Sequence, residues 1–151
     1  PAFLLSEINK LINIIENYLE SDLVLMDVQE NTRGNFIRVV VDAERPVTLF
    51  DTTELSRKLR DDSEIDSRFP NGFRIEVTTP GLDQSLQRPF QFRKNMDREL
   101  KVTYMDGDID RTICCKVLGA DDKTVHLKEN DMEYNLSYSQ IKSAKVKISF
   151  K

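Results

Sequence analysis

Apolar and polar side chains alternate most regularly from Phe73 to Thr78. A period of two is expected for a strand that buries one of its faces. Pro80-Gly81 follows at once and predicts the end of the strand, because proline donates no backbone hydrogen bond and glycine adopts turn conformations easily. The pattern before this stretch mixes helices with strands, whereas the pattern after Phe92 is of strands. We therefore expect Phe73–Thr78 to be the last strand of one domain, leading into a rigid connection to a second.

The first forty residues predict a helix and two strands. Apolar residues recur at helical spacing and form one broad face, made of Leu4, Ile8, Leu11, Ile12, Ile15, Tyr18 and Leu19. Strands are expected over Leu23–Gln29 and Phe36–Val41, and the turn-forming residues between them favour an antiparallel hairpin. The first strand is expected to have one apolar side, made of Val24, Met26 and Val28.

A second helix is expected to begin at Thr48, because its hydroxyl and the carboxylate of Asp51 can satisfy the exposed amides of a first turn. It is expected to continue to about Asp61 and to bury Thr52, Leu55 and Leu59. Residues 61–67 are polar and acidic and predict a loop. The resulting order, helix-strand-strand-helix-strand, indicates an α+β domain with its helices on one face of a small sheet.

Residues 93–151 predict short strands separated by turns. A helical connector is expected just before them, over Arg88–Asn95, with Phe90 and Phe92 available to pack between domains. Apolar residues then alternate in three segments, at residues 100–104, 132–136 and 144–150. Regularly spaced short strands suggest a small barrel, which closes off its own edges. We therefore predict two domains, an N-terminal α/β domain over residues 1–92 and an all-β barrel over residues 93–151.

The charge is distributed unevenly along a chain whose composition is that of a folded protein. Of the 151 residues, 32% are charged, and the net charge is −4. Residues 1–92 carry a net charge of −6 and residues 93–151 one of +2. An acidic half can attract a basic partner, and a mildly basic half can approach nucleic acid. We expect no membrane span, because no apolar run reaches roughly 18 residues, and we expect no secretory signal at this N-terminus.

The residue types that carry chemistry are too scattered to predict an enzyme. The acidic segment Asp106–Asp110 lacks the spacing of a calcium loop. The single histidine, His126, has no ligand spacing around it that favours zinc. Cys114 and Cys115 are neighbours in a predicted strand and point to opposite faces, so we expect two reduced thiols, as in a cytoplasmic protein. We expect neither a metal nor another cofactor.

Basic residues form two candidate groups for contact with phosphates, which position a protein on RNA without reading its sequence. The first group lies near the end of the second predicted helix and consists of Arg57, Lys58 and Arg60. The second surrounds the connector and consists of Arg88, Arg93, Lys94 and Arg98. A third set, Lys142, Lys145 and Lys147, fits the outward side of an edge strand, where lysine deters aggregation.

The stretch Ile75–Asp83 resembles the strand-and-turn motif of the bacterial ribosome maturation factor RimP family. Further similar segments occur in the right order along nearly the whole chain, at residues 38–42, 47–51, 55–57, 99–102 and 141–146. The chain departs from the family pattern at Gln84 and Ser85, where arginine and proline are usual. It also departs at Phe50, where an acid is common, and at Asp97, where glycine is common.

The resemblance implies an N-terminal α/β domain, a C-terminal Sm-like (SH3-type) barrel, and a cytoplasmic, non-enzymatic factor that binds the maturing small ribosomal subunit. The implied partners are small-subunit ribosomal protein twelve and ribosomal RNA; we expect a monomer with no membrane partner. The expected contact residues are Thr79, Pro80, Gly81, Leu82, Asp83 and Gln84 as a shaped surface, with Arg57, Arg88, Arg93 and Lys94 as charged contacts. One alternative for the site is that Pro80 and Gly81 only set the path between domains. A separate alternative for the function is a general RNA-binding Sm-like module without ribosomal specificity.

Overall fold

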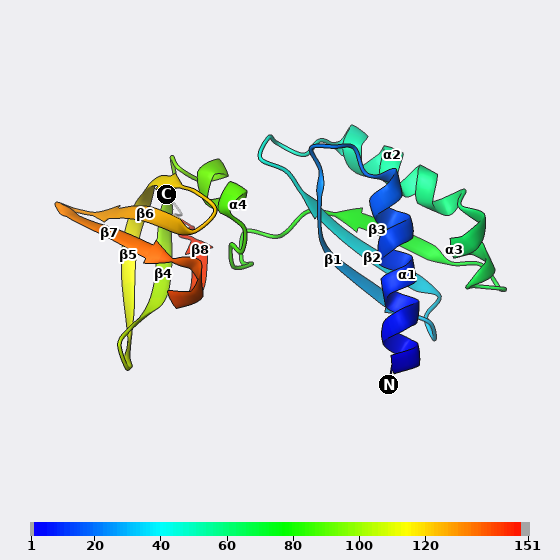
Figure 1. Cartoon of the computed structure of the whole chain (residues 1–151). Helices are drawn as coiled ribbons and strands as arrows, with labels where there is room; N and C mark the ends of the chain where they lie inside the picture. Colours follow the sequence, from blue (N-terminus) through cyan, green and yellow to red (C-terminus); the bar gives the residue numbers. More distant parts are fainter. Residues whose placement is uncertain (1, 149–151) are drawn as a thin grey trace. The chain divides into compact units, whose positions relative to one another are not determined.

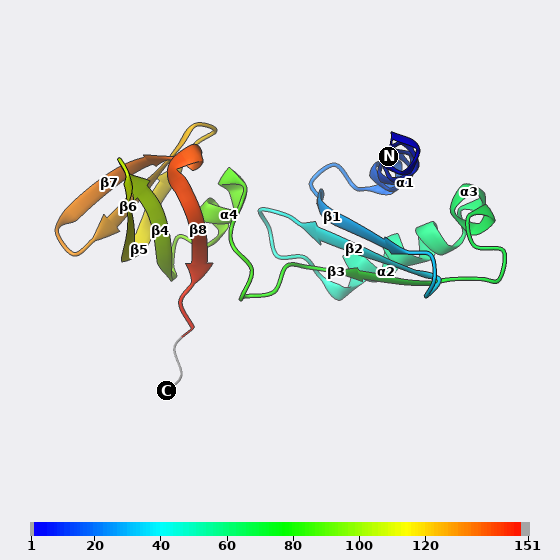
Figure 2. The same ribbon diagram turned by 90° about the horizontal axis from the view of Figure 1, so that it is seen from below.

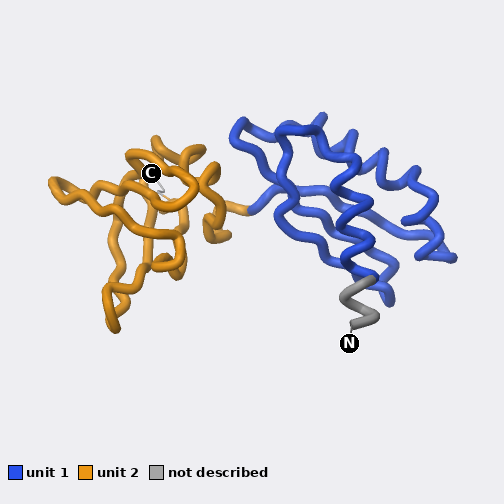
Figure 3. Tube along the Cα trace, in the orientation of Figure 1, with its two compact units in different colours: residues 1–80 blue, residues 81–151 orange. Residues whose placement is uncertain are grey.

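The computed structural model describes residues 2–148, with side chains from residue 7 onward. Within the predicted apolar patterns, the side chain of Leu4 and all of Phe150 therefore lie outside the described residues. The chain divides into two compact units, Pro1–Pro80 and Gly81–Lys151, which Figure 3 colours separately.

The N-terminal unit is a three-stranded sheet with helices packed on one face. Its elements in order are α1 (Ala2–Tyr18), β1 (Val24–Asn31), β2 (Phe36–Asp42), α2 (Leu49–Arg60), α3 (Ser63–Ser67) and β3 (Arg74–Thr78). The sheet order is β1-β2-β3, with β1 antiparallel and β3 parallel to the central strand. Helix α1 lies over one face of the sheet (Figures 1 and 2). The predicted hairpin and the predicted order of helices and strands are confirmed, apart from the additional helix α3.

The core of this unit is built on the central strand β2. Ile37, Val39 and Val41 alternate along it and are completely buried. They pack against apolar residues of the helices, namely Leu11, Ile15, Leu55, Leu59 and Ile65, and against Phe69. The intervening residues of β2 face away from the helices, because successive side chains on a strand point to opposite faces. One of them, Phe36, has the guanidinium of Arg74 5.3 Å above its ring.

Strand β1 does not have the single apolar side, formed by Val24, Met26 and Val28, that the sequence predicts. The ladder with β2 shifts between Leu25 and Asp27, which is a β-bulge. An extra residue in one strand reverses which side chains face the core beyond it. Leu25 and Val28, three residues apart, consequently pack on the same core. The prediction for this strand was wrong because alternation in the sequence does not reveal a bulge.

The acidic segment predicted as a loop over residues 61–67 contains the short helix α3. The carboxylate of Asp62 accepts a hydrogen bond from the backbone N–H of Ile65, at 2.9 Å, and one from the Tyr18 hydroxyl, at 2.5 Å. It therefore caps α3 and ties it to α1. Ile65 is completely buried. One turn of helix holds too few residues to display a helical period, so the pattern did not predict it.

Arg68, at the C-terminal end of α3, connects this helix to β1 and α1. Its guanidinium contacts both carboxylate oxygens of Glu30 on β1, at 2.8 and 3.1 Å, and one of Glu7 on α1, at 3.2 Å. The side chain of Arg68 is only 17% exposed. A two-pronged contact of this kind fixes geometry more strongly than a single pair. It joins three elements that are far apart in the sequence.

The C-terminal unit is an antiparallel sheet preceded by a short helix. Its elements are α4 (Pro89–Lys94), β4 (Glu99–Asp106), β5 (Ile109–Ala120), β6 (Thr124–Glu129), β7 (Met132–Ser137), the 3-10 turn η1 (Tyr138–Gln140) and β8 (Ile141–Val146). The strand order is β7-β6-β5-β4-β8, and the strands are strongly twisted (Figures 1 and 2). The predicted run of short strands is confirmed. Within residues 2–148 no ladder joins β7 to β8, and what the structure shows is a mixed α+β chain with a larger antiparallel sheet.

The segment before β4 packs within the C-terminal unit. Phe92, expected to lie between domains, is 1% exposed in the core of this unit, 5.7 Å from the ring of Tyr138. The backbone N–H of Leu86 donates to the Ala144 carbonyl of β8, at 2.7 Å. Residues 81–92 thus group with the C-terminal sheet by contact. The division into folding domains at residues 92 and 93 stays a prediction.

Truncating Ile65 tests whether α3 belongs to the core. We expect Ile65→Ala to lower the free energy of unfolding by about 2–5 kcal/mol, because it leaves a cavity under a completely buried side chain. The matched control is Ile109→Ala, at a position that is 59% exposed, where we expect a change within about 0.5 kcal/mol. Urea unfolding followed by far-UV circular dichroism measures both. Equal effects would contradict the assignment of α3 to the core.

Candidate functional site

The predicted contact segment Thr79–Gln84 spans the boundary between the two units. Thr79 and Pro80 end the N-terminal unit, and the four residues after them begin the C-terminal unit. The backbone N–H of Gln84 donates to the Gly81 carbonyl at 3.0 Å, which closes a turn. A Cβ atom at Gly81 would lie 2.6 Å from Oδ1 of Asp83, so a larger residue there would require the exposed side chain of Asp83 to turn aside. Leu82 is 54% exposed.

The four predicted basic contacts fall into two groups. Arg88, Arg93 and Lys94 come together on α4 and at its start, where Arg93 donates to the Ala120 carbonyl at 3.0 Å. Arg57 lies on α2 in the other unit. Its guanidinium pairs with Glu54 at 3.0 Å and more loosely with Asp61 at 3.9 Å. Exposed pairs of this kind contribute little to stability, so Arg57 can exchange its partners at small cost.

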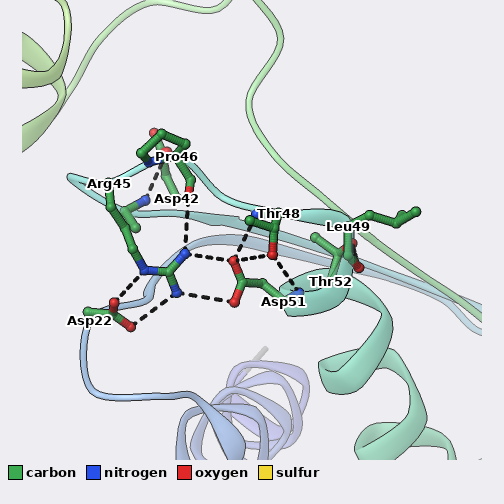
Figure 4. A network of polar contacts seen from close by, with 9 residues as sticks. Asp22, Asp42, Arg45, Pro46, Thr48, Leu49, Asp51 and Thr52 are labelled. Carbon is green, nitrogen blue, oxygen red and sulfur yellow. Dashed lines mark hydrogen bonds and ion pairs between the residues drawn. The ribbon is translucent and has the colours of Figure 1, made fainter.

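A more rigid arrangement surrounds Arg45, just before α2 (Figure 4). The guanidinium of Arg45 reaches both carboxylate oxygens of Asp51, at 2.7 and 3.1 Å, and both of Asp22, at 2.5 and 3.4 Å. It also donates to the carbonyl of Pro46 at 2.9 Å. The arginine therefore connects the end of the loop after α1 with the beginning of α2. Planar, two-pronged contacts suit arginine because its donors form a fixed fork.

The same carboxylate of Asp51 starts helix α2, as the sequence predicts. Oδ2 of Asp51 accepts from the backbone N–H of Thr48 at 2.8 Å, and the Thr48 hydroxyl accepts from the backbone N–H of Asp51 at 3.2 Å. This reciprocal arrangement is a capping box. The side chain of Asp51 is only 13% exposed. One side chain thus serves both the helix cap and the ion pair.

Both aspartates of this network are stabilised in their charged form. Hydrogen bonds from Arg45, followed by those from Thr48, hold the pKa of Asp51 far below its ordinary value. The hydrogen bonds from Arg45 also lower the pKa of Asp22. The two carboxylates consequently stay ionised, and the network stays intact, well into the acidic range.

The network holds two large apolar side chains out in solvent. Leu49 is 82% exposed and Phe50 is 73% exposed, and they occupy the first two positions of α2. Figure 4 shows Leu49 pointing away from the ion pairs. Adjacent exposed apolar side chains on a rigid backbone are typical of surfaces that bind a protein partner. We call this pair the Leu49–Phe50 surface.

Sequence reasoning found the helix cap but missed the rest of this site. Asp22 and Arg45 are separated by 23 residues, and no local pattern links them. The exposure of Leu49 and Phe50 was also not predicted. A usable signal is present in the sequence, however, because a capping residue at Thr48 places the next two residues in the first turn. There, neither lies on the face of α2 that buries Leu55 and Leu59.

The acidic segment Asp106–Asp110 and the buried cysteine do not form a catalytic or metal site in the described residues. Asp106 pairs with Arg111 at 2.7 Å, and Asp110 with Lys142 at 2.9 Å. Burial raises the pKa of the Cys115 thiol to about 12, which makes it a poor nucleophile. No cluster of three or more potential metal ligands occurs among residues 2–148. Over the same residues, no helix is both long and apolar enough to span a membrane.

The structure is that of a mixed α+β protein whose N-terminal unit exposes two adjacent large apolar side chains at the start of α2. Residues 11–83 match the family model of the RimP N-terminal domain. This match over the N-terminal part of the chain supports the RimP family, a family of ribosome maturation factors. The resemblance seen in the sequence motifs is thereby confirmed over residues 11–83, whereas the similar segments at residues 99–102 and 141–146 lie outside the match.

Replacing Arg45 tests the network through its pH dependence. We expect Arg45→Met to lower the melting temperature at pH 7. Folding lowers the pKa values of Asp22 and Asp51. The two carboxylates therefore contribute their full stabilisation above about pH 3.8, the ordinary pKa of aspartate. This stabilisation is lost as the pH falls through the pKa values that the carboxylates have in the folded protein. The difference in melting temperature between wild type and Arg45→Met should therefore shrink below pH 3.8.

The matched control for this test is Arg111→Met, which breaks an exposed pair in the other unit. We expect it to change stability little at any pH. A difference between wild type and Arg45→Met that stays constant from pH 7 to pH 2 would refute the assigned role of the two aspartates.

Proposed function

We propose that this protein is a non-enzymatic, cytoplasmic assembly factor that binds the maturing small ribosomal subunit as a monomer and promotes its biogenesis. The observation that carries the proposal is the match of residues 11–83 to the RimP N-terminal domain. The Leu49–Phe50 surface supports it, because a preformed apolar surface suits binding to another macromolecule.

The N-terminal unit has the charge expected for binding a basic ribosomal protein. Residues 1–80 carry 9 basic and 15 acidic residues, a net charge of −6. Complementary charge speeds association and an apolar centre supplies affinity. We infer that small-subunit ribosomal protein twelve contacts this unit.

The remaining contacts of the proposal come from the predicted site residues. Thr79–Gln84 would supply a shaped surface, and the basic residues Arg57, Arg88, Arg93 and Lys94 would approach ribosomal RNA. Exposure of Leu82 and the closed turn at Gly81 support such a role for the segment. For the C-terminal unit we propose an Sm-like (SH3-type) barrel. Its support is the order of the five strands and the 3-10 turn that links the edge strands β7 and β8.

Co-sedimentation tests the proposed function directly. We expect the protein to sediment with free small subunits, and not with large subunits or assembled ribosomes, at both low and moderate salt. Selective binding that resists moderate salt would reflect an apolar contact as well as charge. Binding to no particle by a folded protein would overturn the proposal. Binding to every RNA-containing particle, abolished by added salt, would instead favour a general RNA-binding module.

A double substitution tests the Leu49–Phe50 surface. We expect Leu49→Ser/Phe50→Ser to weaken small-subunit binding by about tenfold or more, because side chains desolvated at the centre of an interface contribute most of its binding energy. The matched control is Ile109→Ser/Met132→Ser, at positions in the C-terminal unit that are 59% and 61% exposed. Melting temperatures check that both variants fold. Equal loss of binding in both, or in neither, would contradict a role for this surface.

A further inference from the structure

Two pairs of lysines lie directly opposite each other on the C-terminal sheet. Lys101 of β4 is the register partner of Lys145 of β8, and Lys116 of β5 is the partner of Lys128 of β6. All four side chains are exposed, because they alternate with buried residues along their strands. Their shared face is the one turned away from the core of this unit. We call these four residues the lysine face.

The register also joins the two pairs. Lys101 lies opposite Cys114, and Lys116 follows two residues later on the same strand. Directly opposite side chains on neighbouring strands have Cβ atoms about 5 Å apart, and diagonal neighbours lie about 7–8 Å apart. The four ammonium groups thus extend across four adjacent strands, β8, β4, β5 and β6. They form one basic band, which is interrupted by Glu99 of β4, the register partner of Lys116.

None of the four ammonium groups has an ion-pair partner among residues 2–148, whereas other lysines of the same unit do. Lys142 pairs with Asp110 at 2.9 Å, and Lys147 pairs with Glu99 at 3.6 Å. Like charges placed directly opposite on a sheet are destabilising. Deterring edge pairing explains a lysine on β8, but it does not explain lysines on the inner strands β4, β5 and β6. A polyanion bound to this face would remove the repulsion.

The surroundings of the lysine face suit phosphate groups. Thr103 and Thr112, next along β4 and β5, carry hydroxyls 2.9 Å apart, and Ser143 of β8 lies opposite Thr103. Hydroxyl and ammonium groups are common donors to phosphate oxygens. Three carboxylates lie on or beside this face: Glu99 is the register partner of Lys116, Glu133 is that of Lys128, and Glu129 follows Lys128 on β6. Of these, Glu99 is already paired with Lys147, and the Glu129 carboxylate accepts the backbone N–H of Cys114 at 3.2 Å.

We propose that the lysine face binds the phosphate backbone of RNA. A protein partner with acidic residues is less well matched, because protein interfaces depend on an apolar centre, and the centre of this face holds lysine, threonine, a thiol and the carboxylate of Glu99. The one large exposed apolar residue that follows on β5, Leu118, lies beyond Lys116 and is 41% exposed. This site is separate from the predicted contacts at Thr79–Gln84 and on α4.

The proposal does not depend on the ribosomal role of the protein, because free RNA suffices to test it. Binding of the full chain to a short RNA hairpin can be measured by fluorescence anisotropy at several salt concentrations. The two test variants are Lys101→Gln/Lys145→Gln and Lys116→Gln/Lys128→Gln. The matched control is Lys123→Gln/Lys142→Gln, which removes the same charge from the same unit outside the lysine face.

We expect each test variant to bind the hairpin at least about tenfold more weakly at low salt. The slope of log K against log salt should also fall, by roughly 0.7–0.9 for each phosphate that the variant no longer neutralises. Melting temperatures should stay equal or rise, because a repulsive pair has been removed. The control should keep most of the affinity and slope. Equal weakening in test and control variants would overturn the proposal, since net charge alone would then explain binding.

Cys114 offers a local readout in the wild-type protein. Its thiol is exposed opposite Lys101, whereas Cys115 is buried, so iodoacetamide should modify Cys114 selectively in the folded protein. We expect saturating RNA hairpin to slow this modification several-fold. No protection at saturation would place RNA elsewhere and refute the site. If polyglutamate protects the thiol as well as RNA does at equal charge, the occupant is an acidic protein surface and the RNA proposal is wrong.

Discussion

In each unit one face of a small sheet is buried and the other is left to the solvent. Strands impose this division, because alternate side chains point to opposite faces. On β2, Ile37, Val39 and Val41 are completely buried beneath the helices. In the C-terminal unit, Val102 and Cys115 are buried while Lys101 and Lys116 stay outside. Every second side chain of a strand is thus buried in the core, and the side chains between them face solvent and can be polar or charged.

Ion pairs that span long stretches of sequence then fix the helices onto the N-terminal sheet. Arg45 joins Asp22 to Asp51 at the start of α2, and Arg68 joins β1 and α1 at the end of α3. Each guanidinium contacts two carboxylates, so three chain segments are held in one geometry. A helix start held this firmly can keep Leu49 and Phe50 in solvent without collapse onto the core. Rigidity of this kind lowers the entropy cost of binding a partner.

Sequence patterns predicted most of the fold in segments long enough to show a regular repeat of apolar residues. The helix face at Leu11 and Ile15, the cap at Thr48 and the alternation of β3 all appear in the structure as expected. The bulge in β1 and the single turn of α3 were missed, because each is shorter than the period that would reveal it. The contact residues Thr79–Gln84 were predicted from a motif and the basic contact residues from their charge, and both sets stay predictions. They lie on an exposed turn, on α2, and on α4 and at its start.

The sequence by itself determined which elements form, where the chain is acidic or basic, and the family to which the N-terminal unit belongs. These properties depend on short stretches of sequence or on amino-acid composition. Only the tertiary structure decided that Asp22 meets Arg45, that Leu49 and Phe50 stay exposed, and that lysines from four strands share one face. Such juxtapositions depend on strand register and on contacts between distant segments. A shift of register by one residue would turn every one of those lysines to the other face.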